Sequence, residues 1–559
     1  MLANSSTALE GEYDVCVVGS GPAGLACALR CQERGLRVLV LEAGGLRPVP
    51  GSPDILAADI ETPDSHDPTD ITAASAFGGG GHWWGGRCVP LDPVDFDTWP
   101  VSAGEMRDWT LKAATFLGSE VLDNQPPEGA LARMSRFHVR NQECWGPQLN
   151  MAKRWAGRLL SADAPTVVTG ARVTQLTIED QRIATVHVRH GGEDHTLSPP
   201  HTVLACGGLG VMRLLLMAQQ RDPALFGGPN GPLGRGYMGH LTGSIARFSP
   251  AHPNDIRHFH INERAGKLQS RRRFQPENET VRESGLANIS FWIDSATISD
   301  PDHPAPVASA RHLAGRLMRK ISTRGAPSGQ GPLGPHVQNV MRSPLQAAAG
   351  LGASFYYLAF SRVTGRHPRA RRPTPVSPNV YRLDYHAEQT PHPDNRVSLS
   401  GNLDSLGMPK LRIRLSFHDE DIRSVVQMHD LLDEDLRRAG AGELGWRVPP
   451  ESRFDAVKAS ARDGYHQLGG AVMSSRPTDG VVAPDGRVHG VDNLWIASSC
   501  TFPTGGQANP TLSIVALSLR LSERLAELAK GGRRDRTPHN NVGVSADHAA
   551  DRTHSISSH

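Results

Sequence analysis

The glycine spacing near the start of the chain limits its fold more than any other feature of the sequence. Gly19, Gly21 and Gly24 follow a short β-rich run at residues 14–18 and lead into an apolar run at residues 25–34. In a strand–turn–helix unit, the first glycine permits a tight turn and the second lets a phosphate group approach the backbone. The third allows the helix to pack closely on the strand. The spacing therefore predicts a strand–turn–helix unit in a sheet of α/β class.

An acidic residue completes this unit. Gly35 ends the predicted helix, residues 38–41 read as a second strand, and Glu42 follows directly. A carboxylate at this position accepts hydrogen bonds from the ribose hydroxyls of a bound dinucleotide. The pattern predicts a dinucleotide site, and the alternative is a glycine-rich turn that binds nothing. It does not distinguish a nicotinamide from a flavin.

A second glycine-rich stretch favours a flavin. Six of the nine residues at 78–86 are glycine, interrupted only by His82, Trp83 and Trp84. Glycine at this density costs chain entropy, so it is expected where backbone must lie against a flat, bulky group. A flexible surface loop is the alternative, but two tryptophans in the loop favour burial.

The segment GGQANPTLSIVALSLR, residues 505–520, predicts a buried helix with a polar start. Pro510 suits the first helical position, where no N–H is needed, and Asn509 suits the N-cap. The free N–H groups at such a start attract an anion. An ordinary capped core helix is the alternative. Upstream, residues 201–218 predict a strand, a glycine turn and a helix that return the chain to the first sheet beside the cofactor.

Composition excludes several classes of function. The 559 residues carry a net charge of +2, which is too balanced for a nucleic-acid-binding surface. The seven cysteines form no CxxC pair and no zinc-finger spacing, so we expect packed, reduced thiols, no metal site and a cytoplasmic setting. We identify no signal peptide and no run long enough to span a membrane. A chain of this length predicts two or more lobes.

In their order along the chain, these motifs resemble the glucose-methanol-choline (GMC) family of flavoprotein oxidoreductases. The matching segments are GSGPAG with Glu42, GGGGHWWGGRCVPLD, LACGGLGVMRLLL, GPLGRGYMGH and the closing HQLGG…RVHGVDNLW…FPT…ANPTLSIVALSL. Residues 387–413 are similar to bacterial members, and the ending is similar to the pyranose-oxidase-like branch. The likeness extends over residues 13–530 and is diffuse at 249–379.

The resemblance implies FAD as cofactor and a two-lobed α/β (α+β) fold. A Rossmann-like FAD-binding domain would be interleaved with a substrate-binding domain built on a mostly antiparallel sheet. The cofactor contacts would fall on Gly19, Gly21, Pro22, Ala23, Gly24, Glu42, Ala43, Gly79, Gly80, Gly81, His82, Trp84, Gly85, Val173, Ala205, Ser498, Ser499, Asn509, Pro510 and Thr511.

The sequence departs from the family pattern at two positions. Ser498 stands where many members have Asp, and Gly470 stands where Thr or Ser is usual. In some members a histidine of the second glycine loop is joined covalently to the flavin. Matching on WGG puts Trp83, and not His82, at that position, so covalent attachment through His82 is left open.

The same match implies His466 as the catalytic histidine and Asn509 as its partner. Oxidation of an alcohol gives a hydride to flavin N5, and the hydroxyl proton must pass to a base, for which imidazole is suited near neutral pH. Asn509 would hold the alkoxide-like oxygen or orient His466. We therefore predict an FAD-dependent oxidase or dehydrogenase that converts a secondary alcohol of a sugar or glycoside to a ketone.

Other functions stay in view. A lyase on the same fold, a non-catalytic flavoprotein, or a dehydrogenase subunit that oxidises a non-sugar alcohol and passes electrons to a partner would carry the same motifs. The expected partners are a small-molecule substrate and an electron acceptor, either O2 or an external carrier. Nucleic acid and an integral membrane segment are not expected, and the oligomeric state is open.

The predicted organisation has five parts. These are a disordered N-terminus at 1–12, an FAD-binding part at 13–247 with a cap segment at about 97–165, a substrate-binding domain at 248–448, a second FAD-binding part at 449–530, and a disordered tail at 531–559. Residues 345–360 and the basic run after them predict a core helix beside solvated charges, with docking on a membrane or partner as the alternative.

Candidate sugar contacts lie in the substrate-binding part. Residues 286–295 alternate like a strand, which would place Phe291 and Trp292 on opposite faces, so that one could stack on a sugar ring. Tyr381 and Tyr385 are further candidates, with core packing as the alternative for each. Glu388 and Gln389 would either bind sugar hydroxyls or support the fold.

Overall fold

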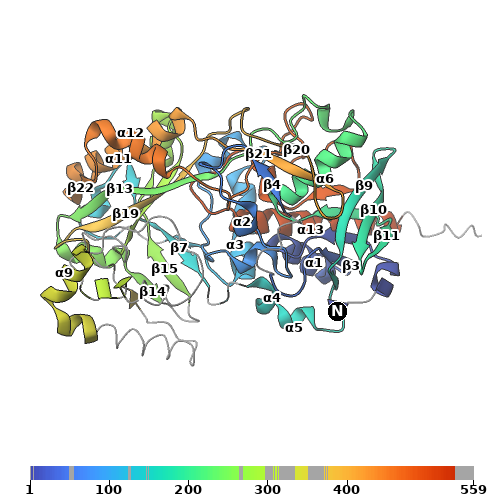
Figure 1. Cartoon of the computed structure of the whole chain (residues 1–559), viewed down its shortest axis with the longest axis horizontal. Coiled ribbons are helices and arrows are strands. Elements are labelled where there is room, and N and C mark those ends of the chain that lie inside the picture. The colour runs from blue at the N-terminus through green and yellow to red at the C-terminus, as the bar shows by residue number, and fades with distance from the viewer. Residues whose placement is uncertain are drawn as a thin grey trace, which may run out of the picture.

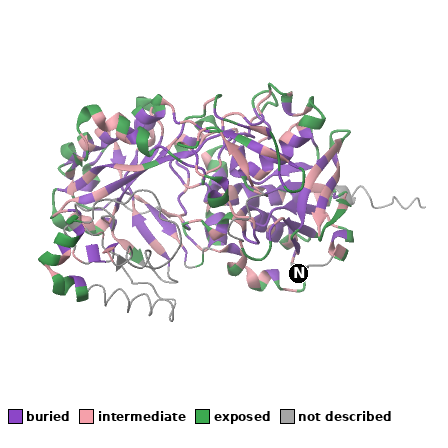
Figure 2. Cartoon of the chain, in the orientation of Figure 1, coloured by how far each residue is buried: buried purple, intermediate pink, exposed green. Residues whose placement is uncertain are grey.

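The computed structural model of the chain describes residues 6–48, 56–123, 127–146, 150–263, 268–295, 334–349 and 375–534, with short pieces at 2–3, 148, 306, 309–310, 312–313, 370–371 and 373. They form two lobes with the chain crossing between them several times (Figure 1). Each lobe has a buried interior and an exposed outer layer (Figure 2). Most of residues 350–372 and the tail after residue 534 lie outside the described residues, and so do the predictions made for them.

The first lobe is built on a six-stranded parallel sheet in the order β1-β8-β3-β2-β12-β23. β2 (Val15–Val18) lies between β3 (Val38–Glu42) and β12 (His201–Leu204). β8 (Thr166–Thr169) and β23 (Leu494–Ile496) continue the sheet on either side. Every residue of β2 and β3 is buried, because elements cover both faces of the sheet. The predicted strand–turn–helix–strand start and the return of residues 201–204 to this sheet are confirmed.

Helix α13 (Thr511–Arg534) packs against both α1 (Pro22–Glu33) and α3 (Ala103–Leu117) beside this sheet (Figure 1). The Ser518 hydroxyl of α13 donates to the backbone oxygen of Ala23 in α1 over 2.7 Å. This contact ties the closing helix of the chain to the first one. All seven cysteines are described and all are free thiols, six of them buried.

The beginning of the chain differs from the disordered N-terminus expected at 1–12. β1 (Leu2–Ala3) pairs in parallel with β8 at the edge of the sheet, and residues Ser6–Glu10 form a 3-10 helix. Leu9 is buried in the core, and the Tyr13 hydroxyl donates to the backbone oxygen of Ala8 over 2.7 Å. The contacts of residues 2–3 and 6–12 are therefore with a sheet edge and an apolar pocket, neither of which is visible in local composition.

The second lobe contains a four-stranded antiparallel sheet in the order β17-β19-β13-β22. Its strands are β17 (Ile289–Asp294), β19 (Tyr381–Glu388), β13 (His240–Pro250) and β22 (Gly442–Trp446). One face packs on α11 (Asp419–Ala439) through apolar side chains such as Phe291 and Tyr385. The other face is more polar and includes Trp292 and His386. The predicted alternation of Phe291 and Trp292 is confirmed.

Strands from distant parts of the chain complete both lobes. β5 (Leu122–Asp123) and β7 (Asn141–Trp145), from the segment expected to be a cap, join β15 (Gln269–Arg272), β14 (Ile261–Glu263) and β18 (Ala370–Arg371) in a five-stranded sheet. β20 (Arg396–Leu403) and β21 (Pro409–Arg414) instead form a three-stranded sheet with β4 (Ala58–Ile60), which pairs with β21, near α6 (Gly208–Arg221) in the first lobe. The two lobes therefore exchange segments across the boundaries expected at 248 and 448.

The remaining elements are short or peripheral. They are the antiparallel strands β9 (Arg172–Glu179), β10 (Arg182–His190) and β11 (Glu193–Leu197), the pair β6 (Phe137–His138) and β16 (Gln275–Pro276), and the helices α2 (Thr69–Thr72), α4 (Met151–Arg154), α5 (Ala156–Leu159), α7 (Asn278–Ser284), α9 (Gly334–Arg342) and α12 (Arg453–Ser460). Within the described part of the chain, none of the helices is long and apolar enough to cross a membrane.

Because of one buried histidine in this core, we predict that the folded protein becomes less stable as pH falls. His429 of α11 is packed against Phe291, Tyr385 and Trp446, and burial lowers its pKa to about 4. The unfolded chain takes up this proton near pH 6.5 and the folded chain does not, so stability falls as pH falls from about 6.5 toward 4. Between pH 7.5 and 5.5, protonation of His429 in the unfolded chain should lower the free energy of unfolding of the unmodified protein by about 1.4 kcal/mol. His429→Gln should lack this part of the loss. Urea unfolding of the holoenzyme at both pH values measures this, and equal acid sensitivity in the two proteins would contradict it.

Candidate active site

A cavity of about 780 Å³ opens where the carboxyl ends of four neighbouring parallel strands meet. Val18 ends β2, Glu42 ends β3, and Ala205 and Ser498 follow β12 and β23 closely; all four residues line the cavity. The chain leaves β2 toward β3 on one side and returns through β12 on the other. In open α/β sheets, ligands bind at such a switch in strand order.

The two glycine-rich loops meet at this cavity. The backbone N–H and the hydroxyl of Ser20 both donate to Glu42 Oε2, and Ser20 Oγ accepts from the backbone N–H of Gly78 at 3.1 Å. Glu42 Oε1 accepts from the N–H of Gly44 at 2.8 Å. Burial raises the pKa of Glu42, and these hydrogen bonds oppose that shift. The acid therefore fixes both loops, and its predicted contact with ribose stays a prediction.

Close backbone contacts explain why glycine is required in these loops. Gly19 has a φ of +103°, and a Cβ there would lie 2.6 Å from the backbone oxygen of Ala205. A Cβ on Gly24 would lie 2.0 Å from the oxygen of Gly19, and one on Gly79 would lie 2.8 Å from Cα of Gly21. Gly21 itself faces open space, because a Cβ on it would have no neighbouring atom within 4 Å. The helix start beside Gly21 therefore leaves room for a phosphate group.

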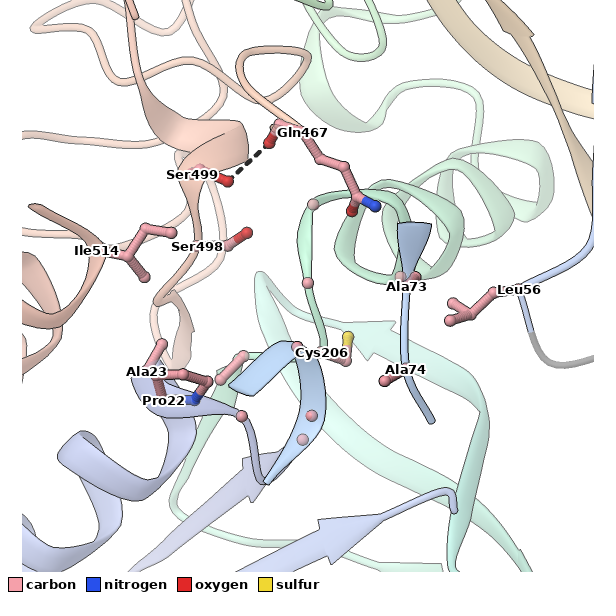
Figure 3. Close-up of a pocket in the computed structure, with 18 of the residues that line it drawn as sticks. Pro22, Ala23, Leu56, Ala73, Ala74, Cys206, Gln467, Ser498, Ser499 and Ile514 are labelled. Atoms are coloured by element: carbon pink, nitrogen blue, oxygen red, sulfur yellow. Dashed lines mark hydrogen bonds between the residues drawn. The ribbon is translucent and has the colours of Figure 1, made fainter. Parts of the chain in front are cut away.

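Most residues predicted to hold the cofactor line the cavity. The members that do so are Gly19, Gly21, Pro22, Ala23, Glu42, Ala43, Gly79, Gly80, Trp84, Gly85, Val173, Ala205, Ser498, Ser499, Asn509, Pro510 and Thr511. Figure 3 shows Pro22 and Ala23 on one side of the cavity and Ala73 and Ala74 on the other. Gln467 also lines it, and its backbone oxygen accepts from the Ser499 hydroxyl over 2.7 Å.

Three predicted contacts lie elsewhere. Gly24 and Gly81 are buried in the packing of the loops and are not among the lining residues. His82 is turned away, with Nε2 2.9 Å from the backbone oxygen of Phe77 and Nδ1 3.4 Å from the Asn150 side chain. Its neighbours Trp83 and Trp84 line the cavity instead. The structure thus gives no support to covalent attachment through His82.

His466 and Asn509 meet at the second side of the cavity. Asn509 Nδ2 lies 3.1 Å from His466 Nε2, and both residues line the cavity. α13 begins at Thr511, one residue later than expected, and the Asn509 side chain contacts His466 rather than the helix backbone. The predicted pair is therefore in contact, while the predicted N-cap role of Asn509 is replaced by this contact.

A chain of hydrogen bonds fixes which nitrogen of His466 carries its proton. His240 is buried, and burial with the nearby charge of His466 lowers its pKa to about 3, so its ring is neutral. His240 Nε2 lies 3.0 Å from the backbone oxygen of Gly506, which can only accept. His240 Nδ1 therefore accepts, and it lies 3.0 Å from His466 Nδ1. The proton of neutral His466 is then on Nδ1, and Nε2 carries a lone pair toward Asn509.

A buried carboxylate strengthens this arrangement. Asp463 Oδ2 lies 3.2 Å from His466 Nδ1 and accepts from the backbone N–H of His240 at 2.7 Å. Asp463 Oδ1 accepts from three backbone N–H groups at residues 464–466. Burial acts to raise the pKa of Asp463, but the charge of His466 and these hydrogen bonds lower it far below its ordinary value. The carboxylate is therefore ionised and stabilises a proton gained by His466.

A third histidine lies beside this pair. His386 stacks on His240 with ring centroids 4.2 Å apart, and its Nδ1 lies 2.9 Å from the backbone oxygen of Gln507. One ring nitrogen each from His240, His386 and His466 lie within 4.8 Å of one another, the spacing of a metal site. Because Gly506, Gln507 and Asp463 already pair with ring nitrogens, we interpret the cluster as a hydrogen-bonded support for His466.

Sequence reasoning did not assign Asp463, His240 or His386 to the site. Asp463 lies three residues before His466 in DGYH, and His240 closes the GPLGRGYMGH segment, so the first two had a local signal. His386 had none, because only the pairing of β13 with β19 brings it to His240. Gly470, one of the departures from the family pattern, has a φ of +89° and faces Met212 so closely that a Cβ would lie 2.2 Å from its sulfur. A larger residue would not fit there.

Five of the six residues proposed as sugar contacts lie in the packing of the fold. Phe291 and Tyr385 are fully buried in the apolar core, and Tyr381 is buried as well. The Glu388 carboxylate accepts from the N–H of Gly506, and Gln389 bonds to backbone groups on two sides. These five residues support the fold. Two aromatic residues that had no such assignment line the cavity with exposed rings, Trp83 at 51% and Tyr465 at 52%.

Sequence comparisons agree with this geometry. A sequence model of the family described as GMC oxidoreductase matches residues 391–518, which include His466 and Asn509. A second, described as FAD binding domain, matches residues 14–237, which include both glycine loops. The residues present therefore fit FAD: an open helix start for its phosphates, an acid at the end of β3, and one cavity lined by both loops.

Relatives of known activity align over most of the chain. It is 27% identical over 552 residues to 6'''-hydroxyparomomycin C oxidase of Streptomyces lividus, covering 92% of this chain and 91% of that protein. It is 24% identical over 581 residues to paromamine 6'-oxidase of Streptomyces fradiae, with the same coverage of 92% and 91%. A solved structure of a new fungal aryl-alcohol oxidase has the same fold, with a TM-score of 0.52, 15% identity, and coverage of 93% and 99%. With these matches and the site they enclose, the chain is a GMC-type FAD-dependent oxidoreductase that acts on CH–OH groups.

Proposed function

We propose that this enzyme oxidises a secondary alcohol of a sugar or glycoside to a ketone, with His466 as the general base. The observation that carries the proposal is the lone pair on His466 Nε2. It follows from the hydrogen bonds that place the ring proton on Nδ1, and it faces the cavity beside Asn509. FAD, held by the two glycine loops, would supply the hydride acceptor for the carbinol carbon.

Three residues of the chain would transfer the proton and stabilise the charges that this transfer creates. His466 Nε2 takes the hydroxyl proton, and the ring becomes a cation. Asp463, 3.2 Å from Nδ1, stabilises that cation. Asn509, whose amide hydrogen points at Nε2 before substrate binds, is placed to donate to the substrate oxygen as its negative charge develops.

Two observations support a carbohydrate as the substrate. Trp83 and Tyr465 present exposed aromatic rings at the cavity, and Tyr465 precedes His466 directly. An aromatic ring with one open face offers a flat apolar surface to a sugar ring. The two relatives above are named as oxidases of aminoglycosides, which contain sugar rings.

The free cysteines support the expected reducing, cytoplasmic setting.

An anaerobic titration tests the proposal. The purified holoenzyme is followed by absorbance while neutral sugars, glycosides, amino sugars, sugar acids and simple secondary alcohols are added in turn. We expect the flavin band to bleach with a carbohydrate and the product to carry a new ketone, detected by mass spectrometry after borodeuteride reduction. Bleaching only by non-carbohydrate alcohols would contradict the sugar assignment. A band that no alcohol bleaches would favour the lyase or non-catalytic alternatives.

A further inference from the structure

Three arginines surround one tryptophan on the polar face of the second lobe's sheet. The guanidinium carbons of Arg87, Arg271 and Arg273 lie 5.1, 5.0 and 5.7 Å from the ring centroid of Trp292. Arg87 follows the second glycine loop and lines the cavity, whereas the other two are buried. We call these four residues the arginine cluster.

The arginine cluster has more positive than negative charge. Glu143 contacts Arg271 Nε at 2.6 Å and Arg87 Nε at 3.3 Å, so one buried carboxylate serves two guanidinium groups. Asp294 is 3.9 Å from Arg271 and nearly half exposed. The charges of the three arginines overcome burial and lower the pKa of Glu143 to about 2. A concentration of buried cations of this kind is costly unless an anion joins it.

Two other nearby carboxylates are already engaged. Asp384 forms an ion pair with Arg382. Asp92 accepts from the side chains of Asn288 and Gln507, and burial raises its pKa. Among the described residues, Glu143 is therefore the only buried carboxylate that forms an ion pair with the arginine cluster, and the partly exposed Asp294 contacts Arg271 at 3.9 Å.

Two buried donors of the cluster, and one beside it, have no hydrogen-bond partner among the described residues. Arg273 is 2% exposed; one terminal nitrogen donates to Gln507 Oε1 over 2.8 Å, but its Nε–H is unpaired within the described structure. Trp292 Nε1–H is buried and unpaired in the same way, and so is the Ser290 hydroxyl. Leaving a buried donor unpaired is unfavourable, so such groups call for a ligand rich in oxygen.

The arginine cluster lies next to the proposed catalytic residues. Ser290 is directly opposite His386 in the sheet, and Trp292 is two residues further along the same face. Gln507 joins the two sites, because its side chain accepts from Arg273 while its backbone oxygen accepts from His386. Arg87 lines the same cavity as His466.

We infer that Arg87, Arg273 and Trp292 form a subsite for an anionic oxygen group of the substrate, a carboxylate or a phosphate. The inference rests on the proposed function and narrows it: the preferred carbohydrate is acidic, unlike the amino sugars named for the two relatives. The guanidinium groups supply charge and paired donors to the anion, and Trp292 supplies a further N–H. The exposed ring of Trp83 would then contact the neutral part of the sugar.

Matched ligands test this subsite on the holoenzyme. Methyl β-D-glucuronide carries a carboxylate, glucose 6-phosphate a phosphate, and methyl β-D-glucoside neither. Dissociation constants are measured anaerobically from the shift of the flavin absorbance band, and reduction is measured separately as bleaching. We expect at least one anionic ligand to bind about 10- to 100-fold more tightly than the glucoside. The carboxylate and phosphate arms show which anion is preferred.

Variants of Arg87 distinguish a loss of anion binding from a loss of folding. Arg87 is 37% exposed, so Arg87→Gln should fold and should lose the preference, while Arg87→Lys should keep part of it. Arg140→Gln is the control, because Arg140 is similarly exposed at 41%, is paired with Glu277 and lies away from the cavity. Equal affinity for charged and neutral ligands, or a preference that survives Arg87→Gln, would overturn the subsite.

The outcomes also separate this inference from the proposed function. Anion binding that depends on Arg87, with no bleaching by any alcohol, would support the subsite and contradict the proposed oxidation of sugars. Bleaching by neutral sugars, with no preference for the anionic ligands, would support oxidation and remove the subsite.

Discussion

Replacing His466 by Ala is expected to slow flavin reduction by alcohol at least about 100-fold and up to about 10,000-fold, the usual contribution of a general base. The loss has a specific cause: Nε2 is the unprotonated nitrogen that faces the cavity, and Asn509 beside it has no lone pair on its amide nitrogen to replace it. FAD should stay bound, because the phosphate site that we propose for it lies at the glycine loops and not at His466. Anaerobic stopped-flow absorbance measures the reduction rate and the bound flavin in one experiment.

A second histidine variant provides the control for this result. His429→Gln removes a buried imidazole on the far, apolar face of the second lobe's sheet. It should reduce its flavin at the unmodified rate at pH 7.5. A His466→Ala enzyme that is reduced as fast as the control would show that another group takes the proton.

Asp463→Asn is expected to lower the reduction rate about 100- to 10,000-fold with the flavin still bound. The carboxylate accepts on both oxygens, from three backbone N–H groups on Oδ1 and from His240 and His466 on Oδ2. An amide puts a donor on one side. If that donor faces His466 Nδ1, it would move the ring proton to Nε2 and remove the base. An Asp-to-Asn exchange in a catalytic triad lowers kcat about 10⁴-fold.

Rate and affinity measured separately distinguish a role of Asp463 in proton transfer from simple damage to the site. Without the negative charge 3.2 Å from Nδ1, the cation that His466 forms on taking the proton loses its stabilisation. The loss should therefore fall on the reduction rate at saturating substrate, with the substrate dissociation constant nearly unchanged. Weaker substrate binding with an unchanged saturating rate would contradict this role.

A matched carboxylate controls for the loss of backbone hydrogen bonds. Asp435 is also buried and accepts from the backbone N–H groups of Ser135, Arg136 and Phe137, but it lies outside the cavity. Asp435→Asn should reduce stability and leave the reduction rate at saturating substrate unchanged. Comparable slowing in both variants would mean that the effect of Asp463→Asn is structural.

The sequence was most informative where chemistry depends on neighbouring residues. The spacing of Gly19, Gly21 and Gly24 specifies a turn that few other residues can form, since a Cβ would strike backbone at two of these positions. The acid Glu42 comes at the end of its strand, so its position beside the turn could be predicted as well. His466 and Asn509 were assigned from family-like motifs, and the fold brings them to 3.1 Å.

The sequence left the outcome open where a partner distant in sequence decides it. Residues 2–3 lie in a segment expected to be disordered, and they pair with the edge of the sheet at residues 167–168. His82 was considered for a cofactor contact because of its loop, yet the oxygen of Phe77 and the side chain of Asn150 hold its ring away from the cavity. Glu388 was considered for sugar binding, but the N–H of Gly506 takes its carboxylate.

The sequence by itself determined the cofactor-binding unit, the family resemblance and the two residues proposed for the reaction centre. These depend on spacings of a few residues, and such short spacings largely determine the local backbone conformation. Only the tertiary structure decided how His466 is protonated and what surrounds the substrate. His240, His386 and Asp463 come from three separate segments, and Arg87 and Arg273 from two more. Their pairing depends on strand register and burial, and these arise only when the two lobes pack together.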